Sequence, residues 1–230
     1  MKKIIGLLIF FFMSGTCFCQ INLFLLAKKS NIKPDITGKT IYFFGNSITY
    51  GYGASVPSNC WVGLLTTAKS LTAINKGVSG TMLTGYPPQY ASPAMVNRLS
   101  EIPTYSSNLI IWFDYGINDS YLGRTFNTDS LTKYYTVVIN NLISKGWPMK
   151  SVFIMDIYLY FSTNYANGPT TIIFNTAIKN LCKTYGINYI PIRQEMINAG
   201  FSTSNEISDH VHPNDSGYNI IFNGILKYIK

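Results

Sequence analysis

The sequence predicts an α/β fold in which helices cover both faces of one five-stranded, mostly parallel sheet. Residues 41–44 and 109–113 are unbroken apolar or aromatic runs, which are typical of strands buried on both faces. Residues 128–145 and 170–185 instead repeat apolar side chains at helical spacing. Because such strands and helices alternate from residue 39 to the end, we expect a single three-layer α/β/α domain with a doubly wound sheet.

The remaining elements follow from local signals of the same kind. Strands are predicted at residues 39–45, 73–75, 108–115, 151–157 and 188–192. Helices are predicted over residues 59–71, 94–99, 128–145 and 170–185, and from Pro213 to residue 228. We expect Thr128 or Asp129 to cap the third of these helices, and Pro213 to occupy the first position of the last one.

Residues 1–19 have the features of a secretory signal peptide. A basic start precedes the apolar run 4–13, and residues 17–19 form a cleavage site. The run is too short to span a bilayer comfortably, so we expect no stable membrane insertion after cleavage and a secreted or periplasmic protein. A lipid anchor on Cys17 is less favoured, because residues 13–16 match lipoprotein signals poorly. The domain is then expected at 39–230, after a connector at 20–38.

The composition limits the partners of the chain. The 230 residues carry a formal charge of +8, which falls to +6 when the two lysines of the signal peptide are removed. The remaining basic residues are scattered, which argues against a nucleic-acid partner. Two cysteines remain, Cys60 and Cys182, and we favour two buried thiols over a disulfide. We expect no metal and no cofactor, because no close Cys/His cluster is present. The oligomeric state is not indicated.

The first strand ends at residues 45–47, Gly-Asn-Ser, in a tight turn that presents Ser47. One interpretation is structural, since Asn and Ser are common turn residues and Ser47 could cap the following helix. The other is nucleophilic catalysis, which requires a base, an orienting carboxylate and donors for an oxyanion.

Three loops follow the first three strands and should lie at one edge of a parallel sheet, which brings Ser47, Gly80 and Asn118 together. His212 precedes the last helix and can reach the same edge. A histidine can take the serine proton, and Asp209, three residues earlier, can accept from its other nitrogen. The backbone N–H groups of Ser47 and Gly80 and the side-chain amide of Asn118 could supply three oxyanion donors.

Four short blocks carry a resemblance to a known family over about residues 39–230. They are residues 45–47, 75–80 (Asn-x-Gly-x-Ser-Gly), 116–119 (Gly-Ile-Asn-Asp) and 209–213 (Asp-His-Val-His-Pro). Each block is weak alone, but in this order and spacing the chain resembles the SGNH or GDSL-type serine hydrolases. The resemblance implies a flavodoxin-like arrangement of the sheet.

The resemblance also implies a role for individual residues. Ser47 would be the nucleophile, His212 the base and Asp209 its partner. Gly80 and Asn118, with the N–H of Ser47, would form the oxyanion hole.

The motifs are compatible with alternatives at three positions. His210 competes with His212 as the base, although the spacing from Asp209 favours His212. Gly77 competes with Gly80 as an oxyanion donor. Asn46 stands where the family usually has aspartate.

The implied activity is ester hydrolysis through an acyl-enzyme. Aromatic loop residues suit stacking on sugar rings, so the first choice of substrate is an acetylated carbohydrate. The expected partner is accordingly a glycan ester or a small-molecule ester. A lysophospholipase or thioesterase-type acyl-ester hydrolase is the closest alternative, and an acyltransferase or a catalytically silent glycan-binding module are further ones. The loop tyrosines are Tyr50, Tyr52, Tyr86, Tyr90, Tyr121, Tyr158, Tyr160 and Tyr165.

Overall fold

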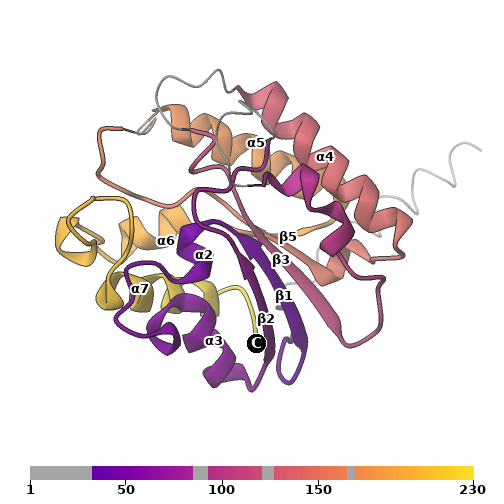
Figure 1. Cartoon of the computed structure of the whole chain (residues 1–230), viewed down its shortest axis with the longest axis horizontal. Coiled ribbons are helices and arrows are strands. Elements are labelled where there is room, and N and C mark those ends of the chain that lie inside the picture. The colour runs from indigo at the N-terminus through magenta and orange to yellow at the C-terminus, as the bar shows by residue number, and fades with distance from the viewer. Residues whose placement is uncertain (1–32, 85–92, 121–126, 165–168) are drawn as a thin grey trace, which may run out of the picture. The chain divides into compact units, whose positions relative to one another are not determined.

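The computed structural model describes residues 33–84, 93–120, 127–164 and 169–230 (Figure 1). The predicted signal peptide and most of the predicted connector lie outside these residues. Residues Pro34–Lys230 form one compact unit. The end of the predicted connector belongs to this unit, because Ile36 is fully buried and the N–H of Lys230 donates to the carbonyl of Pro34 at 2.9 Å. Within the described ranges, no helix has both the length and the apolar character needed to cross a membrane.

The central sheet has five strands in the order β2-β1-β3-β4-β5, and every neighbouring pair is parallel. This order is that of a flavodoxin-like doubly wound sheet. The predicted α/β fold is therefore confirmed, with a fully parallel sheet. The strands are β1 (Thr40–Gly45), β2 (Thr72–Gly77), β3 (Leu109–Asp114), β4 (Val152–Met155) and β5 (Asn188–Ile190).

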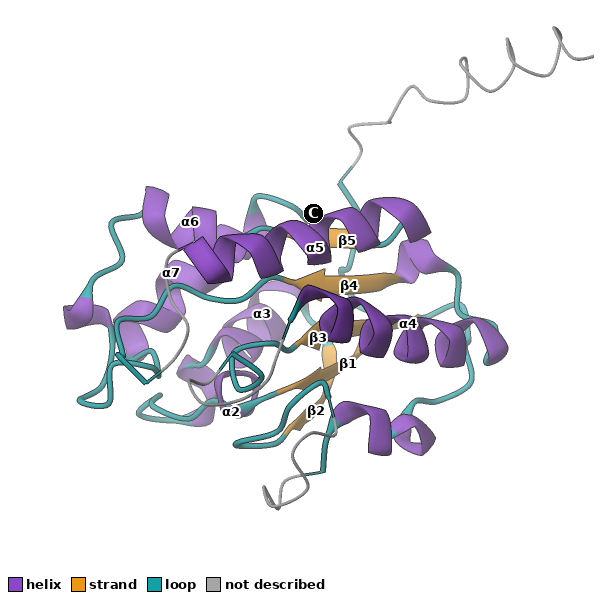
Figure 2. Cartoon of the chain, turned by 90° about the horizontal axis from the view of Figure 1, so that it is seen from above, coloured by secondary structure: helices purple, strands orange, loops and turns teal. Residues whose placement is uncertain are grey.

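Helices cover both faces of this sheet. Helices α4 and α5 pack together on one face, whereas α3 and α7 lie on the other, with α6 against α7 (Figures 1 and 2). The described α-helices are α2 (Ser47–Tyr50), α3 (Trp61–Lys69), α4 (Thr128–Ser144), α5 (Pro169–Tyr185), α6 (Ile192–Asn198) and α7 (Asp215–Leu226). Short 3₁₀ turns occupy Pro57–Asn59, Met95–Asn97, Leu99–Glu101, Met149–Ser151 and Thr203–Asn205.

The two faces of β1 explain its continuous apolar run. Phe43 points to one face, where its ring meets Trp61 of α3 at 5.3 Å between centroids. Phe44 points to the other face and stacks on Phe113 of β3 at 5.7 Å. Both phenylalanines are fully buried, so the strand needs apolar side chains at consecutive positions. Cys60 and Cys182 are buried and unpaired, as expected.

Several predicted boundaries were wrong for local reasons. Asn127, and not Thr128 or Asp129, caps α4, because its side chain accepts the N–H of Ser130. Pro213 does not begin the last helix, since Asn214 caps α7 by accepting the N–H of Gly217. The predicted helix at 94–99 consists of two 3₁₀ turns, and the predicted strand at 188–192 ends early because α6 follows Pro191.

Candidate functional site

The site is built around the turn between β1 and α2. A Cβ atom at Gly45 would lie 2.1 Å from Oγ1 of Thr49, so only glycine allows the first turn of α2 to fold back on the strand. Asn46 caps this helix, because its Oδ1 accepts the N–H of Ile48 at 2.8 Å. The structural interpretation of Ser47 as the cap is thus wrong. Ser47 is instead the first residue of α2.

A buried aspartate braces this turn from the end of β3. The side-chain amide of Asn46 donates to the carbonyl oxygen of Asp114 at 3.3 Å. Oδ2 of Asp114 accepts the hydroxyls of Thr49 at 2.6 Å and Tyr158 at 3.0 Å. Burial raises the pKa of Asp114 to about 7, although these donors oppose the shift. Sequence reasoning missed Asp114, and the available signal was a charged residue at the end of an apolar strand.

His212, in the loop before α7, contacts Ser47 at the start of α2, although the two residues are far apart in the sequence. Its Nε2 is 2.7 Å from Oγ of Ser47, and its Nδ1 is 2.6 Å from Oδ2 of Asp209. The other oxygen of Asp209 accepts the backbone N–H groups of Val211 and His212. Burial tends to raise the pKa of Asp209, but the hydrogen bonds from His212 and the backbone outweigh it, and the pKa is lowered. The predicted serine, histidine and aspartate therefore form one continuous hydrogen-bonded chain.

His210 does not take part in this chain. Its Nδ1 lies 3.7 Å from Oε2 of Glu206, and about half of its side chain is exposed. Its backbone has a left-handed φ of 56°, which turns the loop between Asp209 and His212. The geometry thus distinguishes the two histidines and places His212 beside the serine.

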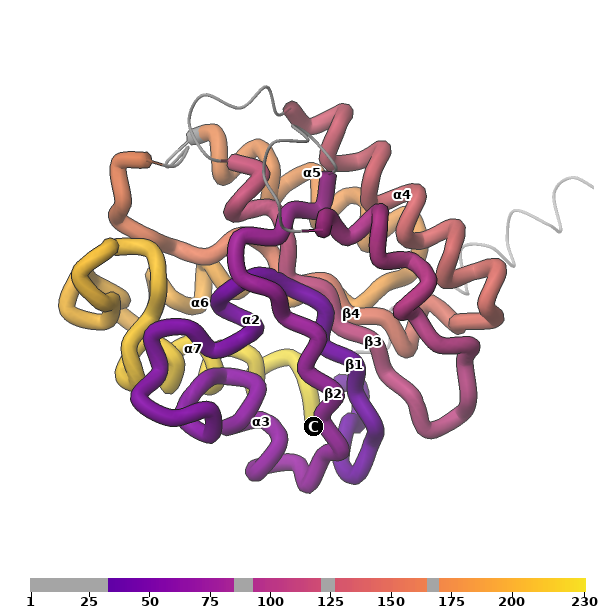
Figure 3. Tube along the Cα trace, viewed as in Figure 1, coloured from indigo at the N-terminus to yellow at the C-terminus, as the bar shows by residue number. Residues whose placement is uncertain are grey.

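Close packing joins the segment after α2 to the segment that carries His212. A Cβ at Gly53 would lie 2.4 Å from the carbonyl oxygen of Pro213. The buried hydroxyl of Tyr218 in α7 donates to the carbonyl of Tyr52 at 2.7 Å. The Tyr52 ring packs on the His212 ring at 4.6 Å between centroids. Figure 3 shows the corresponding proximity of α2 and α7, which are distant in the sequence.

The predicted oxyanion donors lie on loops tied to the same edge. The N–H of Val78 donates to the carbonyl of Gly45, which holds the loop after β2 beside the serine turn. The side-chain amide of Asn118 donates to the carbonyl of Thr81 at 2.9 Å, which joins the loops after β2 and β3. Gly80 has a left-handed φ of 74°, a conformation that suits glycine.

Gly77 is a poorer candidate for an oxyanion donor. Its N–H donates to Oδ1 of Asn75 at 2.9 Å. A Cβ at Gly77 would lie 2.4 Å from the backbone nitrogen of Tyr50, so the residue is glycine because α2 packs closely against it. Packing therefore explains Gly77.

The predicted tyrosines divide into two groups. Tyr50 and Tyr52 are 61% and 50% exposed. Tyr158 and Tyr160 are buried in the core, so the expectation that they present their rings from a loop was wrong. The other four, Tyr86, Tyr90, Tyr121 and Tyr165, lie outside the described residues.

Comparison with solved structures supports the fold. The structure of TesA has 18% sequence identity and a TM-score of 0.65, over 84% of this chain and 98% of that chain. A member of the lipolytic protein G-D-S-L family from Veillonella parvula has 21% identity and a TM-score of 0.61, over 82% of this chain and 96% of that chain. A carbohydrate acetylesterase family member from Sinorhizobium meliloti has 16% identity and a TM-score of 0.65, over 81% of this chain and 95% of that chain.

Sequence comparison identifies the family. A search of curated protein sequences finds no match. The model of the GDSL-like Lipase/Acylhydrolase family matches residues 43–220, a range that contains Ser47, Asp209 and His212. The chain belongs to the GDSL-like lipase/acylhydrolase family, whose members hydrolyse esters.

Proposed function

We propose that the protein is an exported serine esterase that removes acetyl groups from carbohydrates through an acyl-enzyme. The observation that carries the serine mechanism is the contact of Ser47 with His212 at 2.7 Å, together with that of His212 with Asp209 at 2.6 Å. Both distances are those of hydrogen bonds in a nucleophile, base and carboxylate arrangement.

The reaction proceeds in two halves. Nε2 of His212 accepts the proton of Ser47 while Oγ attacks the ester carbonyl, and Asp209 stabilises the resulting imidazolium. The collapse of the tetrahedral intermediate breaks the ester C–O bond, and His212 returns its proton to the leaving alcohol. Water, deprotonated by the same histidine, then attacks the acyl carbon. The bond between Oγ of Ser47 and the acyl carbon breaks, the acid leaves, and His212 returns the proton to Oγ.

Three donors stabilise the negative oxygen of each tetrahedral intermediate in this proposal. The N–H of Ser47 lies at the start of α2, where helical N–H groups have no acceptor within the helix. The N–H of Gly80 and the side-chain amide of Asn118 complete the set. Their loops are held to the serine turn by the bonds of Val78 and Thr81 described above.

The carbohydrate substrate is supported by the aromatic surface beside the base. Tyr52 packs on His212 and exposes half of its side chain, and Tyr50 is more exposed still. Amphipathic aromatic rings of this kind suit contact with sugars. A fold neighbour is described as a carbohydrate acetylesterase family member, which is consistent with this choice. The proposal of export is supported by the apolar run at residues 4–13, which follows two lysines as in a signal peptide.

The test compares three esters in the purified mature chain. We expect hydrolysis of p-nitrophenyl acetate and of acetylated xylo-oligosaccharides, with much slower turnover of p-nitrophenyl octanoate. Ser47→Ala should abolish the activity, whereas Ser144→Ala, at an exposed position in α4, should not. A preference for octanoate would contradict deacetylation in favour of a longer acyl ester. A folded but inactive wild type would contradict the esterase.

A further inference from the structure

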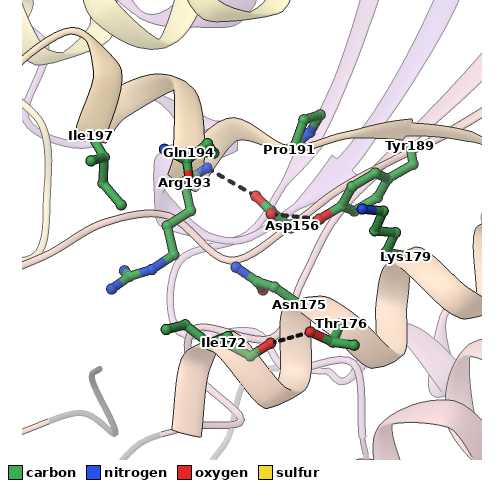
Figure 4. A pocket seen from close by; sticks show the side chains of 10 residues that line it. All are labelled: Asp156, Ile172, Asn175, Thr176, Lys179, Tyr189, Pro191, Arg193, Gln194 and Ile197. Atoms are coloured by element: carbon green, nitrogen blue, oxygen red, sulfur yellow. Dashed lines mark hydrogen bonds between the residues drawn. The ribbon is translucent and has the colours of Figure 1, made fainter. Parts of the chain in front are cut away.

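A pocket whose lining does not include the serine lies between α5 and α6. It has a volume of about 500 Å³, within the range typical of small-molecule sites. Helices α5 and α6 form its sides, and the segments that follow β4 and β5 form its floor (Figure 4). Its lining residues are Asp156, Ile172, Asn175, Thr176, Lys179, Tyr189, Pro191, Arg193, Gln194 and Ile197.

The pocket lies at the same edge of the sheet as the candidate active site. Asp156 directly follows β4, just as Asn46 directly follows β1, and all strands are parallel. Because β3 separates β1 from β4, the two strands are about 10 Å apart. None of the lining residues is Ser47, Asp209 or His212. The pocket is therefore a separate site on the face where ligands of such sheets bind.

The floor of the pocket is a preformed polar network. Oδ2 of Asp156 accepts a hydrogen bond from the hydroxyl of Tyr189 at 2.7 Å, and Oδ1 accepts one from the backbone N–H of Arg193 at 3.0 Å. The side chain of Asn175 both donates to and accepts from the backbone of Ile157. These groups already have partners within the protein. Binding of a ligand would therefore depend on the side chains of the walls.

The walls carry two cations. Arg193 is half-buried, and its guanidinium donates to the carbonyl of Tyr158 at 3.3 Å, which restricts its position. Lys179 of α5 is exposed. Asp156 is the one carboxyl among the ten described lining residues. Burial raises the pKa of Asp156 to about 7. At neutral pH this carboxyl is therefore only partly ionised, and it offsets less than one full positive charge. The walls therefore favour an anion.

The same walls expose large apolar side chains. Ile172 on α5 is 57% exposed, and Ile197 on α6 is 47% exposed. In the view of Figure 4, the Arg193 side chain extends between these two isoleucines. A cation beside exposed apolar surface matches a ligand that joins an anionic group to an apolar chain. Sugars alone would not require the isoleucines, and an inorganic anion would not use them.

We propose that this pocket binds a carboxylate that carries an apolar chain of several carbons. The carboxylate lies against the guanidinium of Arg193, within the field of Lys179, and the chain lies over Ile172 and Ile197. A planar guanidinium can bind a carboxylate through two parallel hydrogen bonds. This site goes beyond the proposed esterase function, because none of its groups takes part in the reaction at Ser47.

Calorimetric titration with hexanoate, acetate and 1-hexanol tests this inference, since each control lacks one half of the ligand. We expect hexanoate to bind at least about tenfold more tightly than either control, because each buried methylene contributes roughly fourfold in affinity. Arg193→Gln should weaken hexanoate binding at least tenfold, and Lys179→Gln at least threefold. Lys183→Gln is the matched control, since Lys183 is also exposed on α5 but does not line the pocket.

Three outcomes would overturn the inference. The first is equal binding of hexanoate and acetate. The second is equal hexanoate binding in wild type and Lys179→Gln, whose exposed side chain can be replaced without disturbing the core. The third is loss of hexanoate binding in His212→Ala, which would place the ligand at the catalytic serine. Hydrolysis of p-nitrophenyl acetate by the same preparations reports on the esterase separately, so a failure here leaves that proposal standing.

Discussion

The side-chain amide of Asn46 donates to the carbonyl oxygen of Asp114 at 3.3 Å, while its oxygen caps α2 at the N–H of Ile48. The residue thus uses a donor and an acceptor at once to hold the serine turn on the end of β3. An aspartate at position 46 could supply only the acceptor. This geometry explains how the turn is braced without the aspartate that is usual in the family.

Asn46→Asp is expected to destabilise this protein. Position 46 is fully buried, and a carboxylate oxygen there would face the carbonyl of Asp114 without a proton to share. The free energy of unfolding should fall by about 1–3 kcal/mol, the cost of a buried polar group without its partner. Urea unfolding at pH 8 measures the change. Equal stability of variant and wild type would show that the bond to Asp114 contributes nothing.

Tyr52→Ala is expected to lower the turnover of p-nitrophenyl acetate. The ring of Tyr52 holds the His212 ring from the side, and an aromatic pair of this kind contributes about 0.5–1.5 kcal/mol. The loss of kcat should be roughly 2-fold to 13-fold, and Tyr52→Phe should restore it. Tyr50→Ala is the control, because Tyr50 ends α2 and is more exposed. A change in KM alone would contradict a positioning role.

Asn118→Ala is expected to lower kcat without unfolding the protein. Removal of one oxyanion donor typically costs about 10²–10³-fold in turnover. The variant also loses the bond to the carbonyl of Thr81, so its melting temperature should be compared with that of the wild type. Unchanged kcat in a folded variant would remove Asn118 from the oxyanion hole.

Glu206 makes the stability of the protein depend on pH. Its side chain is fully buried beneath the loop that carries Asp209 and His210, and its carboxyl oxygens have no hydrogen-bond partner among the described residues. Burial raises the pKa of Glu206 from 4.5 to about 7. Because the unfolded chain loses this proton first, the group reduces stability as the pH rises from about 4.5 to 7.

Glu206→Gln should therefore lose less stability than the wild type over this pH window. The difference in the free energy of unfolding between the two proteins should therefore be larger at pH 8 than at pH 5. Urea unfolding at pH 5 and pH 8 measures it. Glu101→Gln is the control: its pairing with Arg98 lowers the pKa of Glu101, so this group is ionised in both the folded and the unfolded chain above pH 5, and the variant should follow the wild type between pH 5 and pH 8. Parallel pH dependence in wild type and Glu206→Gln would refute the assignment.

The sequence predicted the sheet because apolar runs such as residues 109–113 occur where both faces are covered. It also predicted the contact of Ser47 with His212, because a serine nucleophile needs a base and the block from Asp209 to Pro213 resembles that of the family. Helix starts were less predictable. Thr128 and Asn127 are both good caps, and only the backbone path decides that Asn127 accepts the N–H of Ser130.

Other features depend on tertiary contacts that no local pattern records. Tyr158 stands in a loop-like sequence, yet it is buried because its hydroxyl reaches Asp114. The close approach of Gly53 to Pro213 joins positions that are far apart in the chain. The pocket between α5 and α6 likewise combines side chains from four segments. Its charge and apolar character therefore could not be read from any one of them.

The most direct test of the catalytic assignment is covalent labelling with a fluorophosphonate, followed by peptide mass spectrometry. We expect one adduct, on Ser47, in the wild type, no adduct in Ser47→Ala, and strongly slowed labelling in His212→Ala. Labelling of a different residue, or equally fast labelling of Ser47 without His212, would contradict the proposed roles of these two residues.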